Sequence, residues 1–468
     1  MRHLKIKTML WCSVAALPAI AQAQQEQATG AASSASSSSD DVNVAGEIVV
    51  TAQRRTERLQ DVPIAVTALN QDAAESLGIS TMIDVAKVTP GAYFGNTSGG
   101  FFQPYIRGIG QLFVNPGLEG PVAVYVDGAY IPRTLQITEL LDSVDIASIQ
   151  VLRGPQGTLY GRNATAGVVI LNTADPEIGT YSGKIRAEYG RFNHQIAEGV
   201  INTPLAEDLA LRVTARYRRE GGFVKNAFVD DKTGDGRSYG LRAKLRWQPE
   251  GADITLGGEY QNTKYDLAIG ILADGGATCY ACRLFGVDYS PGGYYTQGSN
   301  PQPAVQNKAY GANLKAIFDL SPHLQLTSTT TWRKQRADGY NDQDFTPLDL
   351  FNFTIPAVGN TTFTQDFVFA TSLDGPVNFL GGVSYLQDRG LYDISFTGQF
   401  FAGPVATTGE FPRFINVGKT KSYAAFAEVY YNITPELKVT AGGRYTSDKR
   451  KLNGTLRDSF AQLIGVEV

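Results

Sequence analysis

The feature that most constrains the fold is a strict alternation of apolar and charged residues in long segments after residue 180. LRVTARYR (Leu211 to Arg218) has Leu, Val, Ala and Tyr at every second position and Arg or Thr between them. YGLRAKLRW (Tyr239 to Trp247) and KIRAEY (Lys184 to Tyr189) repeat the pattern. Successive side chains of a β-strand point to opposite faces, so each segment predicts a strand with one apolar and one charged face.

Similar segments follow along the chain, and their expected starts lie near Gln195, Asp253, Ala309, Leu324, Thr362, Val377, Ser422 and Leu437. The pattern predicts about eleven strands, many of about ten residues or more, whereas strands of soluble proteins usually run about 5 or 6 residues. We therefore expect a mainly β fold built from long amphipathic strands. A soluble sandwich or propeller is the competing interpretation.

The connections between these strands alternate in length. PLAED, QPEGAD, DLSPH, LDGP and NITPE are short, whereas long loops are expected near residues 220–237, 263–308, 339–360 and 391–418. Aromatic residues recur toward strand ends, at Tyr217, Trp247, Tyr260, Trp332, Tyr431 and Tyr445. Bacterial outer-membrane barrels have short periplasmic turns, long external loops and aromatic girdles. The sequence therefore predicts a transmembrane antiparallel β-barrel.

The N-terminus has the order of a secretory signal peptide. Basic residues come first, an apolar run from Met9 to Ile20 follows, and small residues end at Ala23, where we expect cleavage. A membrane anchor is the alternative, but the run is shorter than the roughly 20 apolar residues that a spanning helix needs. Residues 24–46 are rich in Gln, Ala and Ser and predict a flexible linker.

Two cysteines remain after this cleavage, Cys279 and Cys282 in CYAC. An exported chain meets oxidising conditions, so we expect a disulfide between them. A zinc site is the alternative, but zinc takes four ligands and the remaining histidines, His194 and His323, are isolated in sequence. We therefore expect no metal site. The net charge of −4 gives no reason to expect nucleic acid as a partner.

Several motifs in the first third of the chain, together with the strands, resemble the TonB-dependent outer-membrane receptors. They are EIVVTAQRR (Glu47 to Arg55), DVPIAVTAL (Asp61 to Leu69), YIRGIG (Tyr105 to Gly110), VAVYVDGAYI (Val122 to Ile131) and IQVLRGPQGTLYGRNATAGVVILNT (Ile149 to Thr173). One departure is Ala166-Gly167, where the family usually has two glycines. The resemblance implies a mixed α/β plug domain at residues 56–176 and a barrel from residue 180 to 468. It also implies energised uptake of a scarce ligand, most often a ferric siderophore, with no enzymatic activity and no cofactor.

EIVVTA (Glu47, Ile48, Val49, Val50, Thr51 and Ala52) matches the TonB box of the family, within a TonB box region at residues 47–55. The resemblance implies that the energy-transducing protein TonB grips this segment. An exposed β-branched strand suits that role because it can add to a sheet edge through main-chain hydrogen bonds. The alternative is that this segment is only the first strand of the plug.

The glycine-rich stretch VLRGPQGTLYGRNATAG (Val151 to Gly167) could at first sight cradle a phosphate. A phosphate loop joins a strand to a helix and supplies a Lys beside Ser or Thr, whereas this stretch lies between two β-branched runs. We therefore expect its glycines to permit tight turns. We expect Arg107, Arg153 and Arg162 to dock the plug, with Arg153 and Arg162 pairing with carboxylates of the barrel wall.

Ligand contacts can be assigned only through the resemblance, which implies that ligand binds between plug apices and outer loops. NTSGGFFQ and GQLFVN would form these apices and offer Phe101, Phe102, Gln103, Gln111 and Phe113. Aromatic rings suit catecholates and other planar groups. The alternative is that these rings are packing residues.

Eleven strands are half of the roughly 22 strands that the resemblance implies. The sequence therefore predicts a truncated receptor or gene fragment, placed in the bacterial outer membrane as a monomer in contact with lipid. Other interpretations remain open: a passive porin, a secreted soluble β protein, a non-functional fragment, or uptake of cobalamin, oligosaccharides or aromatic compounds.

Overall fold

The computed structural model describes residues 49–51, 53–55, 57–79, 81–96, 102–111, 117–132, 145–226, 232–266, 286, 296–297, 304–342, 348, 351–398, 410–434 and 437–457. The expected signal peptide, the expected linker and the cysteines Cys279 and Cys282 lie outside these residues. None of the helices within the described residues is long and apolar enough to cross a membrane.

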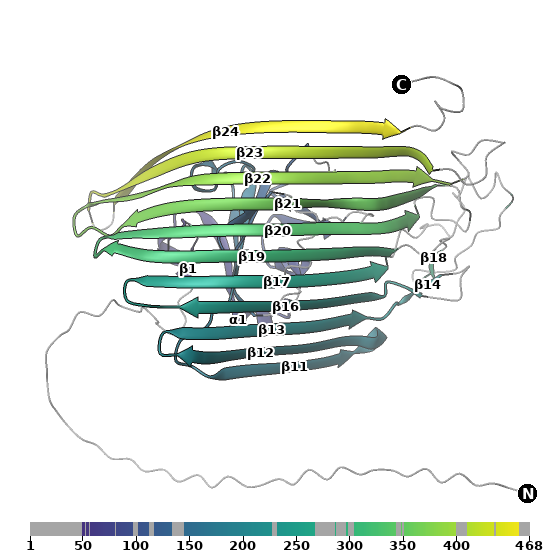
Figure 1. The fold of residues 1–468 in the computed structure, drawn as a ribbon, viewed down its shortest axis with the longest axis horizontal. Helices are drawn as coiled ribbons and strands as arrows, with labels where there is room; N and C mark the ends of the chain where they lie inside the picture. Colours follow the sequence, from purple (N-terminus) through teal and green to yellow (C-terminus); the bar gives the residue numbers. More distant parts are fainter. Residues whose placement is uncertain are drawn as a thin grey trace, which may run out of the picture. The chain divides into compact units, whose positions relative to one another are not determined.

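Eleven strands form one antiparallel sheet in which neighbours in sequence are neighbours in space, and we call this sheet the wall (Figure 1). Its members, in order, are β11 (Ser182–Gly190), β12 (His194–Ala206), β13 (Leu209–Glu220), β16 (Gly236–Trp247), β17 (Ala252–Asp266), β19 (Ala304–Ser321), β20 (Leu324–Asp342), β21 (Asn352–Thr371), β22 (Val377–Thr397), β23 (Glu410–Asn432) and β24 (Lys438–Arg457). The strand lengths grow from 9 residues in β11 to 23 in β23. The expected number of strands and their antiparallel order are confirmed, and β11 and β24 form the two edges of the sheet.

Exposure alternates along the inner wall strands as the sequence pattern predicts, whereas both faces of the edge strand β11 are exposed. On β16, Leu241 is 52% exposed, whereas Lys244 is 3% exposed. The apolar face is therefore the outward face, and the charged face is covered by the N-terminal domain. In a soluble sandwich the arrangement would be the reverse.

Four wall strands extend further than the sequence predicted. β20 ends at Asp342 and β21 begins at Asn352, inside the loop expected near 339–360. β22 and β23 likewise reach Thr397 and Glu410. In these outer parts Ile355, Val358 and Ile394 form a small buried apolar cluster, but the polar Ser395 next to Ile394 is buried too, so hydrophobicity and burial no longer alternate from residue to residue.

We call the described residues between 49 and 176 the plug. Its five-stranded sheet has the order β3 (Ala65–Asn70), β9 (Ile146–Arg153), β10 (Gly167–Thr173), β7 (Val122–Val126) and β8 (Ala129–Ile131). A second sheet contains β4 (Ala92–Asn96), β5 (Phe102–Ile106) and β6 (Ile109–Gly110), and β1 (Val49–Val50) pairs with β2 (Glu57–Arg58). β9 and β10 pair antiparallel, so the glycine-rich stretch joins strand to strand as expected, with only the four-residue α3 (Gly157–Tyr160) between them.

Two short helices follow β3 along the chain. α1 (Gln71–Ser76) is capped by Asn70, and α2 (Met82–Lys87) begins with a capping box in which Thr81 and Asp84 exchange hydrogen bonds. The remaining elements are the 3-10 turns η1 (Leu59–Asp61) and η3 (Arg191–Asn193) and a small sheet of β14 (Val224–Asn226), β15 (Lys232–Thr233) and β18 (Thr296–Gln297).

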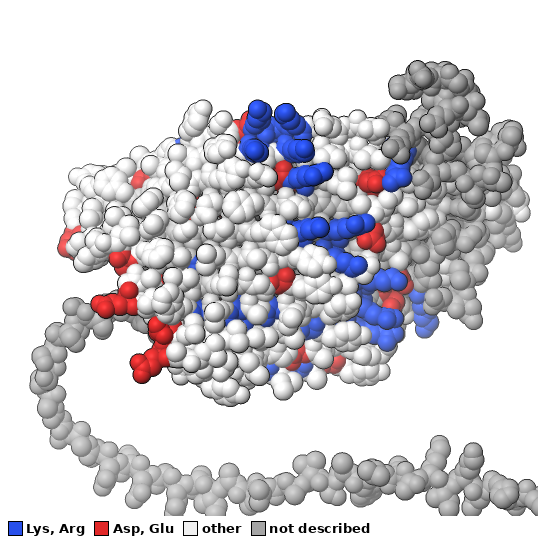
Figure 2. Space-filling model, in the orientation of Figure 1, with Lys and Arg blue, Asp and Glu red and all other residues white. Residues whose placement is uncertain are grey.

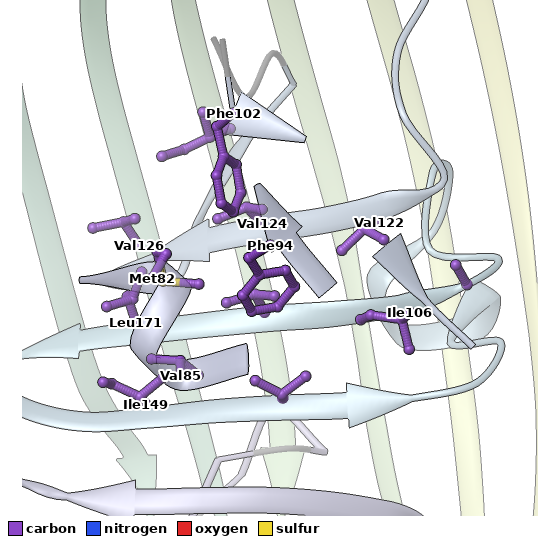
Figure 3. Close-up of a cluster of buried hydrophobic side chains, with 14 of the residues drawn as sticks. Met82, Val85, Phe94, Phe102, Ile106, Val122, Val124, Val126, Ile149 and Leu171 are labelled. Atoms are coloured by element: carbon purple, nitrogen blue, oxygen red, sulfur yellow. The ribbon is translucent and has the colours of Figure 1, made fainter. Parts of the chain in front are cut away.

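The plug has its own apolar core between its two sheets and α2. Met82, Phe94, Phe102, Val124 and Leu171 are among its buried side chains (Figure 3). All members of this cluster come from the plug. The plug is therefore a folded domain with a core separate from the wall.

Gly167 lies at the start of the central strand β10 and allows the closest backbone packing in this core. A Cβ at this position would collide with the carbonyl oxygen of Leu152 and lie 2.7 Å from Cδ1 of Ile106. We predict that Gly167→Ala destabilises the plug by about 2 kcal/mol through overpacking. Hydrogen exchange of the β9 and β10 amides measures this loss.

Gly157→Ala is the matched control, because the space around Gly157 is open. Equal exchange rates in the two variants would contradict the prediction.

Candidate functional site

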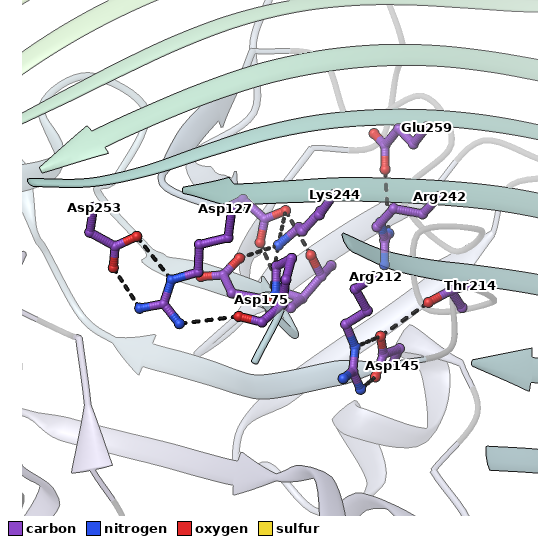
Figure 4. Close-up of polar contacts among 12 residues, drawn as sticks. Asp127, Asp145, Asp175, Arg212, Thr214, Arg242, Lys244, Asp253 and Glu259 are labelled. Atoms are coloured by element: carbon purple, nitrogen blue, oxygen red, sulfur yellow. Dashed lines mark hydrogen bonds and ion pairs between the residues drawn. The ribbon is translucent and has the colours of Figure 1, made fainter. Parts of the chain in front are cut away.

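The plug is held to the first wall strands by ion pairs, and Asp145 makes one of them. Arg212 of β13 donates from Nε and Nη2 to the two carboxylate oxygens of Asp145, at 2.6 and 2.5 Å. Thr214 donates its hydroxyl to the same carboxylate at 3.0 Å (Figure 4). Both charged side chains are almost fully buried. A bidentate pair of this kind fixes both position and orientation.

A second attachment lies at the hairpin between β7 and β8. Asp127 and Gly128 occupy this two-residue turn with φ of 48° and 81°, as a type I′ turn requires. Asp127 accepts hydrogen bonds from the backbone N–H and the hydroxyl of Thr173, both at 2.8 Å, and lies 3.5 Å from Nζ of Lys244. Burial by itself raises the pKa of Asp127, but Lys244 and Arg242 outweigh burial and hold this pKa below its ordinary value.

Lys244 joins two parts of the plug to β16. Its ammonium donates to the carboxylate of Asp175 at 2.7 Å and to the carbonyl oxygen of Thr173 at 3.1 Å. Arg246, two residues further along β16, donates to the carbonyl oxygen of Pro176 at 3.2 Å. The end of the plug is thus attached to the wall just before the chain enters β11.

Arg162, one of the three expected docking residues, lies between the plug and the last wall strand. Its Nη2 contacts both carboxylate oxygens of Glu119 at 2.7 Å within the plug, and its Nη1 donates to Asp448 of β24 at 2.8 Å. The structure therefore brings this cation to a wall carboxylate, as the sequence predicted for it.

The other two expected docking residues do not contact a wall carboxylate. Arg153 donates to the carbonyl oxygen of Pro90 at 3.2 Å, within the plug. Arg107 is exposed in the two-residue turn between β5 and β6, where it and Gly108 have φ of 53° and 75°. The expectation for Arg153 was wrong because strand pairing directs its side chain toward another part of the plug. Arg107 instead occupies the first position of the turn between β5 and β6.

The described part of the TonB box, Val49 to Thr51, lies on the plug. β1 pairs with β2, and Val50 is fully buried in a cluster shared by plug and wall. The backbone N–H of Thr51 donates to the side-chain carbonyl of Gln150 at 3.1 Å, and the hydroxyl of Tyr160 donates to the carbonyl oxygen of Thr51 at 3.2 Å. In this structure the segment is the first strand of the plug, while Glu47, Ile48 and Ala52 lie outside the described residues.

The cation that follows this strand, Arg54, is enclosed by three aromatic rings. Its guanidinium carbon lies 5.5 Å from the ring centre of Tyr125 and 5.4 Å from those of Tyr160 and Phe426. Tyr125 donates its hydroxyl to the carbonyl oxygen of Tyr160 at 2.8 Å. Burial raises the pKa of both tyrosines, so their rings stay neutral beside the cation.

Arg55, the next residue, extends this contact to β23 and β24. Its guanidinium lies 4.1 Å from the ring centre of Tyr430 and pairs with Glu57, which in turn lies 3.5 Å from Nζ of Lys438. The sequence showed Arg54 and Arg55 only as two cations at the end of a strand. Their aromatic partners come from distant segments, so no local pattern could have identified them.

A cavity of about 680 Å³ lies between plug and wall next to this attachment. Thr51, Arg54, Asp127, Lys244 and Asp366 are among the residues that line it. Within the described residues, no three His, Cys, Asp or Glu side chains form a group that could hold a metal ion. The first strand of the plug therefore borders open space on the side where it meets the wall.

The expected ligand residues do not form one site. Phe102 is 2% exposed and packs on Phe94 with ring centres 5.6 Å apart, so it is a core residue and cannot contact a ligand. Gln103 is buried as well, and Gln111 is half-buried. Phe101 and Phe113 lie outside the described residues. Strand β5 explains the correction for Phe102, because its alternation turns this ring toward the plug core.

A long amphipathic wall whose charged face holds a folded domain through ion pairs is typical of a plugged outer-membrane β-barrel, although this eleven-stranded sheet is open between β11 and β24. Comparison with family models agrees: residues 58–168 match the TonB-dependent receptor plug domain, and residues 282–462 match the TonB-dependent receptor-like β-barrel. Together the two matches take in more than half of the chain. The chain belongs to the TonB-dependent receptor family and is a protein of the bacterial outer membrane.

Curated relatives are similar over part of the chain. The pesticin receptor of Yersinia pestis is 26% identical over 247 residues, which are 52% of this chain and 33% of that protein. The ferrioxamine receptor of Yersinia enterocolitica is 25% identical over 218 residues, which are 45% of this chain and 28% of that protein. The matched segment is therefore about a third or less of each relative.

Solved structures show the same fold at low sequence identity. The ferric yersiniabactin uptake receptor of Yersinia pestis superposes with a TM-score of 0.68 at 16% identity, covering 84% of this chain and 61% of that one. The ferripyoverdine receptor of Pseudomonas aeruginosa superposes with a TM-score of 0.65 at 13% identity, covering 89% and 56%.

Asp145 provides a direct test of the ion-pair attachment. We predict that Asp145→Asn lowers the free energy of unfolding of the plug by roughly 3–5 kcal/mol, because it leaves the buried guanidinium of Arg212 without its charge partner. The urea concentration at which a protease cleaves the plug should fall. Asp72→Asn, on the exposed face of α1, is the matched control and should change nothing. An unchanged cleavage profile for Asp145→Asn would contradict the attachment.

Arg54 provides the corresponding test for the first strand. We predict that Arg54→Gln removes a desolvated cation–π contact worth about 2 kcal/mol, so the amides of Val50 and Thr51 exchange roughly 30-fold faster. Hydrogen exchange measures this locally. Lys87→Gln, which removes an exposed cation on α2, is the control. Equal protection of Val50 in both variants would rule out Arg54 as the residue that holds this strand.

Proposed function

We propose that this chain forms the plug and the adjoining barrel strands of a receptor that takes up a ferric siderophore or another iron complex. TonB would supply the energy by gripping residues 47–52. The observation that carries this proposal is the position of the first strand. A short β-branched strand is held on the plug by a few hydrogen bonds and by one cation enclosed by aromatic rings, beside a cavity between plug and wall.

The names of the similar proteins support an iron complex as the ligand. Receptors for pesticin and ferrioxamine are among the curated relatives, and receptors for ferric yersiniabactin and ferripyoverdine are among the similar structures. We assign no catalytic residue, because transport of an intact complex requires binding and movement rather than bond formation.

The two kinds of contact between plug and wall suggest how the plug could move. On β13 and β16 the contacts are ion pairs, whose groups can be solvated by water when they separate. On β21 to β23 the contacts are apolar, since Val368, Leu380 and Phe426 share a buried cluster with Val50 and Leu152 of the plug. A pull on the first strand would act directly on this apolar contact, and the polar contacts could open afterwards.

A TonB-dependent receptor for cobalamin is the second candidate. A vitamin B12 transporter of Vibrio vulnificus is 27% identical over 338 residues, which are 65% of this chain and 53% of that protein. This match is longer than that to the pesticin receptor, although ferrioxamine, ferric yersiniabactin and ferripyoverdine appear in the names of other similar proteins. Oligosaccharides, aromatic compounds and passive diffusion remain further alternatives.

Uptake measurements separate these proposals. The complete polypeptide is produced in cells without their own iron receptors, and accumulation of a panel of labelled ferric siderophores and of cobalamin is compared with and without TonB. We predict uptake of at least one ferric siderophore, and its loss to background when residues 47–52 are deleted. A deletion of equal length within residues 24–46 is the control.

Each other outcome contradicts part of the proposal. Uptake that persists without TonB or without residues 47–52 indicates a passive porin. Uptake of cobalamin but of no ferric siderophore indicates the second candidate.

A further inference from the structure

The imidazole of His194, the first residue of β12, lies between two carboxylates. Its Nδ1 is 2.7 Å from Oε1 of Glu220 at the end of β13, and its Nε2 is 3.1 Å from Oε1 of Glu188 near the end of β11. Ile196 and Glu198, which follow at every second position of β12, are buried, so this face looks toward the plug. The two contacts join the first three wall strands at the end where they meet the longer connections (Figure 1).

The two contacts together require the charged form of the imidazole. A neutral imidazole has one N–H and one acceptor nitrogen, whereas the charged form donates from both nitrogens. An ionised carboxylate can only accept, so a neutral ring would place a lone pair against one of the two carboxylates. His194 therefore holds both partners only when it is protonated. Its side chain is 22% exposed, so the ring can exchange this proton with the medium.

The other charged groups on the neighbouring elements keep their charge near neutral pH. They are Arg186 on β11, Arg191 in the turn η3, Glu198 on β12, and Arg216 and Arg218 on β13. Arg186 donates to Glu188 at 2.7 Å, and Arg218 donates to Glu220 at 2.9 Å. Carboxylates are ionised and arginines are charged at pH 6 and at pH 8 alike, whereas imidazole changes its charge in this range.

Charged side chains on the opposite face of these strands do not belong to this group. Figure 2, which views the outward face, shows blue and red side chains together near the right-hand ends of the lower strands. Arg219 of β13 alternates with Glu220 and so points to this outward face, as does Arg237, which is paired with it in register. Both arginines lie 3.8 Å from Asp235. They therefore have a carboxylate of their own on the outward face.

The turn that precedes His194 is strained and depends on contacts from outside itself. Phe192 and Asn193 have φ of 61° and 55°, and this left-handed conformation is costly for a bulky aromatic residue. The carbonyl oxygen of Phe192 accepts the backbone N–H of Gly221 at 2.8 Å, and a side chain at position 221 would collide with that oxygen. The ring of Phe192 packs on Phe223 with ring centres 5.5 Å apart. The turn is thus docked on the segment that follows β13.

Glu220 connects the imidazole to this docking contact. It directly precedes Gly221, whose N–H bonds to the turn. Phe223 in turn donates its backbone N–H to the carbonyl oxygen of Thr233 at 3.1 Å, which ties β15 to the same segment. When His194 loses its proton, one of its two contacts becomes repulsive, and the docking of the segment is weakened.

We propose that His194 is a pH-sensitive latch at this end of the wall. Its charged form holds the turn η3 against the segment that follows β13, which includes β14 and β15, and the segment is released as the medium becomes alkaline. The latch controls access to the plug-facing side of the first wall strands from the side of the long connections. It is independent of the ligand that the receptor carries and of TonB.

Hydrogen exchange of the Gly221 amide tests the latch, because this amide bonds to the turn. Protection factors, corrected for the pH dependence of the intrinsic exchange rate, are measured at single-residue resolution on the full chain in detergent at pH 6 and pH 8. We predict that the protection of Gly221 falls roughly fivefold at pH 8, since a partly exposed ion pair changes an equilibrium by up to about that factor. The amides of β16 are the reference for a folded wall and should keep their protection.

Three variants separate the latch from other effects of pH. His194→Gln cannot gain a proton, so the protection of Gly221 should be equal at the two pH values. Glu220→Gln should also abolish the pH dependence, because an amide can pair with either form of the ring. His323→Gln is the matched control, since it removes the other histidine of the described residues, in the exposed turn between β19 and β20, and should leave the pH dependence unchanged.

Two results would overturn the proposal. One is equal protection of Gly221 at pH 6 and pH 8 in the unchanged chain. The other is a pH dependence that persists in His194→Gln. If this variant also lowers the protection of the β16 amides, the wall itself is perturbed, and persistence of the pH dependence in Glu220→Gln then decides against the latch.

Discussion

The structure depends on one constraint: the charged face of the wall is buried. Arg212, Arg242 and Lys244 would each lose hydration at a large cost if they faced an apolar partner. Carboxylates of the plug, chiefly Asp127, Asp145 and Asp175, provide the charges that offset this cost. The plug and the wall therefore depend on each other. The plug buries the charged face of the wall, and the ion pairs between plug carboxylates and wall cations fix the position of the plug.

The plug combines two kinds of attachment with different consequences. Ion pairs on β13 and β16 fix its orientation, since each is directional and bidentate or multiply hydrogen-bonded. The apolar cluster with β21 to β23 holds the side that carries the first strand, and Arg54 lies at its border. A domain with its own core can change position as a unit when these contacts open, because the core in Figure 3 contains no wall residue.

The sequence located strands better than it located contacts. Two-residue alternation is local, so eleven strands and the face that each presents could be predicted from the chain alone. The same signal failed at the outer ends of β20 to β23, which were predicted to be loops, because buried apolar and buried polar residues follow one another there without regular alternation. Phe102 and Arg153 were misassigned for a different reason: whether an aromatic ring or a cation in a short strand faces a core, a wall or water is set by the sheet that it joins.

The sequence by itself determined the class of fold, the family and the two chemically distinct faces, because these follow from periodicity and from motifs that are continuous in the chain. Only the tertiary structure decided which charges meet. Arg162 and Asp448 are separated by 286 positions in sequence, and Arg54 lies far from Phe426, yet each pair is in contact.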